Sequence, residues 1–254
     1  SKRLIAKGVA SDSRVESAMR TGRVCVLPGT TNGYVLEELI QAWPDVDWKQ
    51  GIGSAFDKLT FVSGRTLPRS YTGPKIESTM PAVFIHHGEV TVTTSSEAVE
   101  QMEAGDVFIK GVNAINYERR QAGVLIGHPK GGNVGEAIGP IVARRICFLH
   151  PAGLEKNVCG DLEKATEMID ADPDGKGPTL WLVPGPIFTE IEALEVLTGT
   201  QAVPVASGGV GGAEGAVWLS IFGDESALAR ARECLEGIRG EPSFTAEPGV
   251  ADGE

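Results

Sequence analysis

Three short segments of the sequence carry residue types that bind anions or move protons. The first, residues 28–33 (PGTTNG), places glycines, hydroxyls and an amide between an apolar run and a helical pattern. Backbone N–H groups at a helix N-terminus attract anions, and small hydroxyl side chains add donors. The segment predicts an anion-binding turn with contacts from Gly29, Thr30, Thr31 and Asn32. The alternative is a plain tight turn in which Thr31 or Asn32 caps the helix.

The second segment, residues 106–116, is an apolar run that ends at a lysine and continues into polar residues. Lys110, Gly111 and Asn113 follow Ile109 closely, and therefore lie beyond the carboxyl end of the expected strand. Open α/β sheets bind their ligands at that edge. The segment predicts a second set of ligand contacts, and a surface turn at a strand end is the alternative.

The third segment, residues 128–136 (HPKGGNVGE), is rich in glycine. Gly131 and Gly132 let a backbone approach a ligand closely, and Lys130 supplies a point charge. We therefore expect all three to contact the same anion, with an ordinary loop as the alternative.

Metal and redox chemistry have little support in the sequence. His86 and His87 are adjacent, and neighbouring strand residues point to opposite faces, so we expect no metal site and no cofactor. The four cysteines form no C-x-x-C pair. Cys25 and Cys147 lie in apolar runs and are expected to be small core residues, which fits a reducing, cytoplasmic location.

The charge balance narrows the class of partner. Among 254 residues, 34 are acidic and 23 are basic, which gives a net charge of −11. Such a field opposes binding to nucleic acids and to acidic membranes. Local donors and one or two lysines can still hold a small anion, because distant charges are screened over about 8–10 Å. The expected partner is a small anionic metabolite.

Apolar runs alternate with helical patterns through the first two thirds of the chain. This order predicts an α/β domain over residues 1–170, with an open, mostly parallel sheet and helices on both faces. Expected strands are residues 24–27, 58–62, 82–86, 106–109 and 145–149. Expected helices cover residues 35–40, 96–102 and 135–144.

The last third of the chain has a different order of strand and helix patterns. Strand patterns at 180–183, 202–206, 216–222 and 241–244 alternate with helical patterns at 188–197 and 228–238. The order βαββαβ predicts a ferredoxin-like subdomain over residues 176–245. We expect a polar linker at 170–177, a glycine-rich hairpin loop at 208–212 and a disordered tail at 246–254.

In their order along the chain, these segments resemble ribose-5-phosphate isomerase type A and its superfamily. That superfamily includes glucosamine-phosphate isomerases, DeoR-type sensor domains and CoA-transferases. Leu27–Asn32 is similar to the family's Gly-Thr-Gly-Ser-Thr phosphate loop, and Asp106–Asn116 to its Asp-Gly-Ala-Asp-Glu-Val-Asp strand end. Lys130–Gly132 resembles Lys-Gly-Gly-Gly, Lys2 falls on a similar opening helix, and Lys156 falls near the family's Ser-Lys. The resemblance spans residues 2–244 and implies sugar-phosphate binding and a homodimer or higher homo-oligomer.

The departures from the family pattern concern catalysis. Lys110 and Asn113 stand where the family has aspartates, and Gly139 stands where it has its catalytic glutamate. We expect a protonated Lys110, which cannot serve as the carboxylate base that isomerisation needs. Glu136 and Glu118 are the candidates for a relocated base, beside Lys130 as the retained catalytic lysine.

The sequence therefore predicts a protein that binds a phosphorylated or carboxylated metabolite. It is a divergent enzyme of unknown reaction or a sensor rather than a ribose-5-phosphate isomerase. Lys110 adds positive charge where the family carries negative charge, which favours a ligand more anionic than a sugar phosphate at its reactive end. The alternatives are an active isomerase with a relocated base and a ligand-sensing module without chemistry.

Overall fold

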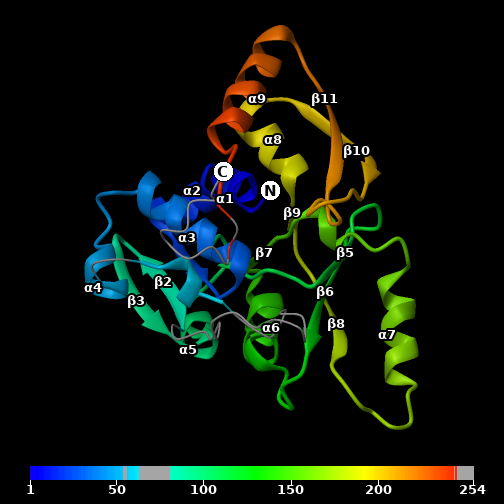
Figure 1. Ribbon diagram of the computed structural model, residues 1–254. Coiled ribbons are helices and arrows are strands. Elements are labelled where there is room, and N and C mark those ends of the chain that lie inside the picture. Colours follow the sequence, from blue (N-terminus) through cyan, green and yellow to red (C-terminus); the bar gives the residue numbers. More distant parts are fainter. Residues whose placement is uncertain (54–55, 63–80, 243, 245–254) are drawn as a thin grey trace.

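A six-stranded sheet forms the centre of the molecule, in the order β3-β2-β1-β4-β7-β9 (Figure 1). The computed structural model describes residues 1–53, 56–62, 81–242 and 244. β1, β4, β7 and β9 run parallel to one another, while β2 and β3 run antiparallel at one edge. The strands are β1 (Arg23–Val26), β2 (Ala82–His86), β3 (Glu89–Thr93), β4 (Val107–Ile109), β7 (Cys147–Pro151) and β9 (Ile187–Phe188). The expected mostly parallel sheet is confirmed.

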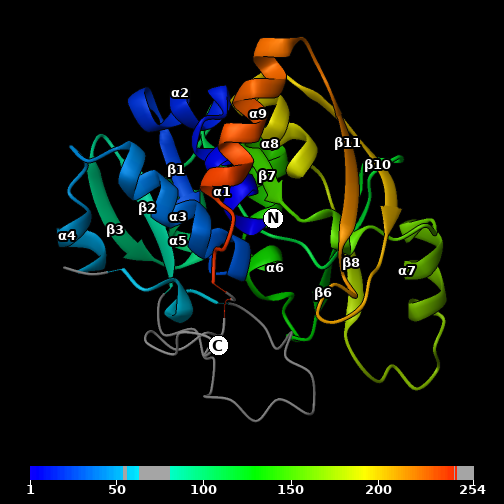
Figure 2. The same cartoon turned by 45° about the horizontal axis from the view of Figure 1, so that its top comes forward.

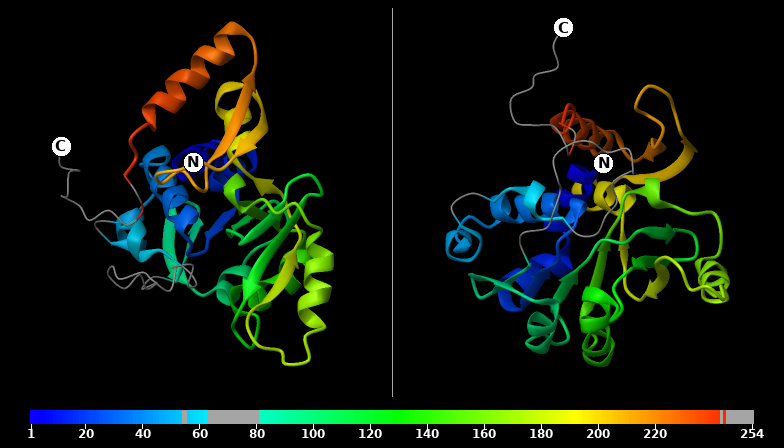
Figure 3. Two further views of the ribbon diagram at one scale, coloured as in Figure 1. Left: turned by 45° about the vertical axis from the view of Figure 1, so that its right-hand side comes forward. Right: turned by 60° about the horizontal axis from the view of Figure 1, so that its bottom comes forward.

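Helices cover both faces of this sheet because its central strands are apolar on both sides. Along β1, Val24 and Val26 enter one hydrophobic core, whereas Cys25 and Leu27 enter the other. This is the pattern of a parallel strand buried on both faces. On the first face lie α1 (Lys2–Ala10), α2 (Ser13–Thr21), α3 (Thr30–Ala42) and α8 (Glu190–Thr198). On the second lie α5 (Ser95–Glu100) and α6 (Gly132–Arg144) (Figure 3).

The C-terminal third does not confirm the ferredoxin-like subdomain. Its strands belong to three different sheets: β8 (Thr179–Val183) pairs with β6 (Gln121–Ile126), β9 joins the central sheet, and β10 (Gln201–Ser207) pairs with β11 (Val217–Phe222) (Figure 2). β5 (Ala114–Asn116) completes the sheet of β6 and β8. The local pattern matched β8, α8, β10, β11 and α9, but it did not predict β9, and element order does not determine which strands pair.

Several shorter elements predicted from the sequence differ from those in the structure. Residues 58–62 were expected as a strand, but Lys58–Thr60 form a short 3-10 helix. Of the expected closing strand 241–244, residues 241, 242 and 244 lie in no strand. The remaining helices are α4 (Trp48–Ile52), the 3-10 turn Leu154–Lys156, α7 (Leu162–Asp170) and α9 (Glu225–Gly237). Asp224 caps α9, because its side chain accepts a hydrogen bond from the N–H of Ala227, and the predicted disordered tail lies outside the described residues.

Helices α1 and α8 approach so closely that only glycine fits between them. A Cβ on Gly8 would lie 2.6 Å from Cα of Ala193 and 2.9 Å from the ring of Phe188. We expect Gly8→Ala to lower the free energy of unfolding by about 1–3 kcal/mol, measured by urea denaturation, because overpacking forces the helices apart. Gly237→Ala in α9 is the control: no described residue lies within 4 Å of its Cβ position, so its free energy of unfolding should rise by up to about 1 kcal/mol. Equal effects of the two changes would contradict the close helix contact.

Candidate functional site

The carboxyl ends of β1 and β4 border a cavity of about 710 Å³, here called the sheet-edge cavity. Its volume suits a small-molecule ligand. Its walls are residues 28–32, residues 110–113, residues 124–129 with 131–134, and the single residues Lys156 and Pro178. The three predicted segments therefore meet at one place. The predicted contacts that line the cavity are Gly29, Thr30, Thr31, Asn32, Lys110, Gly111, Asn113, Gly131 and Gly132.

Helix α3 begins at this cavity without a side-chain cap. Gly29 is the N-cap residue, and no side chain of the described residues accepts a hydrogen bond from the first-turn amides. Thr31 and Asn32, expected as caps if the segment is a plain turn, both lie inside the first turn, so neither is the N-cap. The uncapped amides are the positive end of a 13-residue helix, which attracts an anion.

Helix α6 brings a second uncapped N-terminus to the cavity. Its N-cap, Gly131, has φ of 80°, and Gly132 has φ of 55°, both in the left-handed region that glycine adopts readily. A Cβ on Gly131 would lie 2.8 Å from the ring of Trp181 and 2.9 Å from Cα of Gly135. The glycines are required by this turn, and they place the first amides of α6 along the cavity wall.

Lys110 is buried where β4 ends, with only 8% of its surface exposed. Its N–H donates to the carbonyl of Leu149 (3.0 Å), and its own carbonyl oxygen lies 2.9 Å from Nδ1 of His150. Its ammonium group has no hydrogen bond to any described residue. Burial, with the nearby charge of Lys156, lowers the pKa of Lys110 from 10.5 to about 8. This pKa leaves the amine mostly protonated at pH 7, as the sequence predicts, and about half neutral near pH 8.

Lys156 is the second lysine of the cavity. Its Nζ donates to the carbonyl of Val112 at 2.7 Å, which holds the ammonium beside the strand end that carries Lys110. Burial, and to a smaller extent the charge of Lys2, lowers the pKa of Lys156. The residue was not among the predicted contacts. Its place near the family's Ser-Lys was the one signal in the sequence that pointed to it.

Two asparagines hold the cavity walls together. Asn32 is fully buried, and its Nδ2 donates to the carbonyls of Leu27 (2.8 Å) and Ile109 (3.4 Å), at the ends of β1 and β4. Its Oδ1 accepts no hydrogen bond within the described part of the chain. Oδ1 of Asn113 accepts from the N–H of Leu125 (3.0 Å), which ties the end of β4 to β6. These bonds fix the spacing of three walls before any ligand binds.

The residues predicted as catalytic do not line the cavity. Lys130 is exposed, and its N–H lies 3.2 Å from Nδ1 of His128. Glu136 accepts a hydrogen bond from the hydroxyl of Ser95 at the start of α5, and Glu118 is exposed on the turn after β5. Among the residues that the structure describes, no carboxylate lines the cavity. Its charge therefore comes from two lysines and two helix termini.

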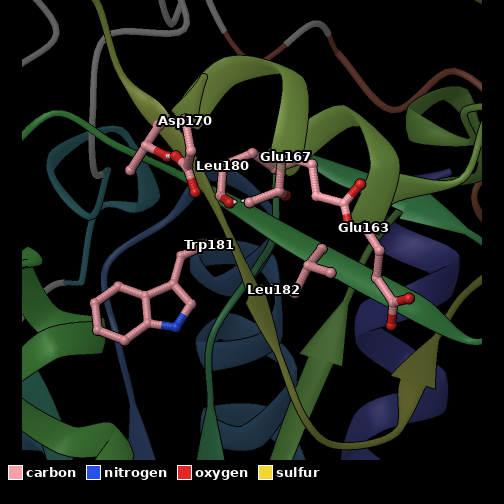
Figure 4. A pocket seen from close by; sticks show the side chains of 8 residues that line it. Glu163, Glu167, Asp170, Leu180, Trp181 and Leu182 are labelled. Atoms are coloured by element: carbon pink, nitrogen blue, oxygen red, sulfur yellow. Dashed lines mark hydrogen bonds between the residues drawn. The ribbon is translucent and has the colours of Figure 1, made fainter. Parts of the chain in front are cut away.

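A second hollow, of about 520 Å³, lies between α7 and β8 (Figure 4). Its charged groups are the exposed carboxylates of Glu163, Glu167 and Asp170, and the hydroxyl of Thr179 donates to Asp170 at 2.9 Å. The ring of Trp181 points away from these carboxylates. Exposed carboxylates repel anions and are well solvated without a ligand. The sheet-edge cavity is therefore the better candidate site.

Comparison of the chain with protein-family models, curated proteins and solved structures found no match. Within the described residues, no helix has the length and apolarity to cross a bilayer, and no three metal-ligating side chains gather in one place. The rings of His86 and His87, predicted to point apart, have centroids 4.1 Å apart, because His87 lies in the turn after β2 with φ of 50°. The sheet-edge cavity is therefore the candidate functional site of the described part of the chain.

Proposed function

We propose that the protein binds a small phosphorylated or carboxylated metabolite in the sheet-edge cavity. One observation carries the proposal: Lys110, Lys156 and the uncapped N-termini of α3 and α6 border one cavity that no described carboxylate lines. Helix N-termini and buried cations both favour anions. The net charge of −11 does not oppose this, because charges beyond about 10 Å are screened in salt.

The same ligand class follows from the resemblance to ribose-5-phosphate isomerases. Lys110 in place of an acidic residue favours a ligand with a second negative group, such as a carboxylated phosphate. An isomerase with a relocated base would need Glu136 or Glu118 at the ligand, and neither lines the cavity. We therefore propose a divergent enzyme or sensor for such anions and do not propose sugar-phosphate isomerisation.

The proposal is tested by calorimetry and thermal unfolding with 3-phosphoglycerate, ribose 5-phosphate and uncharged ribose. We expect the two anions to bind, and an anion at 100 times its Kd to stabilise the fold by about 2.7 kcal/mol, whereas ribose has no effect. Lys156→Met should weaken binding about 10- to 100-fold, because a hydrogen bond to a charged group contributes about 1.5–3 kcal/mol. Absence of binding by both anions at millimolar concentration would overturn the proposal.

Two further lysine variants locate the site. Lys164 is exposed on α7, so Lys164→Met controls for the loss of one positive charge and should bind as the wild type does. Lys130→Met tests whether Lys130 contacts the ligand. The sequence predicts that it does, whereas the structure predicts unchanged binding, since Lys130 does not line the cavity. If Lys130→Met lost as much affinity as Lys156→Met, the ligand would contact the glycine-rich loop and our assignment of the cavity lysines would be wrong.

The homodimer and the cytoplasmic location that the sequence reading expected stay predictions. The hairpin of β10 and β11 supports the former, because it exposes several large apolar side chains that a second copy of the chain would bury. These side chains are Val203, Val205, Trp218 and Phe222.

A further inference from the structure

Lys110 is the one buried lysine in the described part of the chain. Its Nζ makes no hydrogen bond to a described residue and is not one of the fully buried polar atoms without a partner, so it faces the space of the cavity. Its backbone is held on both sides, by the carbonyl of Leu149 and by the ring of His150. The side chain therefore projects from a fixed strand end into the cavity as an unpaired amine.

The surroundings of this amine favour its neutral form. The cavity wall beside it carries no described carboxylate, and Lys156 adds a second positive charge nearby. Together with burial, these features put the pKa of Lys110 at about 8. A desolvated lysine next to another cation is an activated nucleophile, because the neutral amine has the free electron pair that attacks a carbonyl carbon.

We infer that Lys110 captures an anionic aldehyde or keto compound as a Schiff base in the sheet-edge cavity. The inference rests on the proposed function, since Lys156 and the amides of α3 and α6 hold the anionic group while Nζ reaches the carbonyl carbon. The substrate class is thereby narrowed to metabolites that carry both a phosphate or carboxylate and a reactive carbonyl.

The bond changes balance without a redox partner. The electron pair of Nζ forms a bond to the carbonyl carbon, and a proton passes from nitrogen to oxygen to give a carbinolamine. The carbon–oxygen bond then breaks, the oxygen leaves as water after taking up one proton from solvent, and a protonated imine remains. Neither carbon nor nitrogen exchanges electrons with an outside oxidant or reductant.

The experiment traps this imine with glyoxylate and sodium cyanoborohydride, whose hydride converts the imine to a stable carboxymethyl-lysine that peptide mass mapping locates. At pH 7 we expect Lys110 to react about 100-fold faster than the exposed Lys164, because lowering the pKa of Lys110 from 10.5 to about 8 leaves far more of its amine neutral. The rate should level off above about pH 8 rather than pH 10.5. Neutral glycolaldehyde should react with Lys110 more slowly, since it has no anionic group to bind.

The controls separate this inference from the proposed function. Lys110→Arg forms no imine, so it should lose the label at this position, while binding of the unreactive analogue glycolate is measured on the wild-type protein. If Lys110 of the wild type is labelled no faster than Lys164 while glycolate still binds, the Schiff base is excluded and the anion site stands. If glycolate and 3-phosphoglycerate both fail to bind, the proposed function falls together with the inference. The wild-type peptide map gives a result even if Lys110→Arg does not fold.

Discussion

Lys110→Met should raise the free energy of unfolding of the ligand-free protein by about 3 kcal/mol at pH 7, because a pKa lowered from 10.5 to about 8 represents that much unfavourable burial of charge. Methionine fills a similar volume without a charge to desolvate. The same change should lower the affinity for 3-phosphoglycerate at least about 100-fold, since a buried cation facing an anion is lost. Urea denaturation and calorimetry on one preparation measure both effects. A residue whose removal stabilises the fold and abolishes binding is retained for its ligand.

The pH dependence of this gain has a definite sign. The folded pKa of Lys110, about 8, lies below the ordinary value of 10.5, so the unfolded chain binds more protons between these two values. The free energy of unfolding of the wild type therefore rises as the pH increases from about 8 to 10.5. Below about pH 8 the full cost of burying the charged Lys110 is present. The difference in unfolding free energy between Lys110→Met and the wild type should be constant below about pH 7 and should shrink toward zero near pH 10.5.

Lys164→Met serves as the control for this prediction, because an exposed lysine contributes within about 0.5 kcal/mol. A Lys110→Met protein less stable than the wild type at pH 7 would show that the ammonium is charged and paired within the folded chain. That result would contradict both the unpaired amine and the Schiff base inferred from it.

Asn32→Asp is expected to cost about 3–5 kcal/mol of unfolding free energy at pH 7, the range found when one partner of a buried charge is missing. The carboxylate would face the carbonyl oxygens of Leu27 and Ile109, which now accept hydrogen bonds from Nδ2 of Asn32. The deficit should become smaller in acid, where the carboxyl group binds a proton and can donate again. Thermal unfolding from pH 4 to pH 8 measures it.

Asn113→Asp is the matched control, since it adds the same charge to the same cavity. Oδ1 of Asn113 accepts a hydrogen bond from Leu125, and an aspartate oxygen can accept it equally well. We expect a cost well below that of Asn32→Asp. Similar costs for the two variants would mean that added negative charge, rather than the lost donor that joins β1 to β4, causes the instability.

Local sequence patterns were sufficient for three of the four parallel strands of the central sheet. β1, β4 and β7 overlap expected apolar runs and residues 82–86 form the antiparallel β2 as expected, but β9 was not predicted. The candidate contacts were predictable for a related reason: residues after parallel strands meet at the carboxyl edge. Pattern and sheet geometry together therefore located three of the cavity walls.

The remaining parts depend on contacts between distant segments. Residues 121–126 (QAGVLI) form β6, which the sequence reading did not assign, and β6 pairs with β8 more than fifty residues later. No local periodicity encodes that pairing, so an order of βαββαβ was compatible with several sheets. Lys156 was missed for the same reason, because it reaches the cavity through a hydrogen bond to Val112 across the fold.

The cavity walls also have a kinetic consequence. Residues 28–32 lead into a helix of the first hydrophobic core, whereas Val112, Val124 and Val134 belong to the second. Loops this far apart in the chain close late in folding, because their entropy must be lost before their contacts form. We expect an anion that binds across both cores, as proposed, to be absent from the folding transition state and to leave before the chain can open. It should slow unfolding and leave the folding rate unchanged, so ligand concentration would set the lifetime of the folded protein.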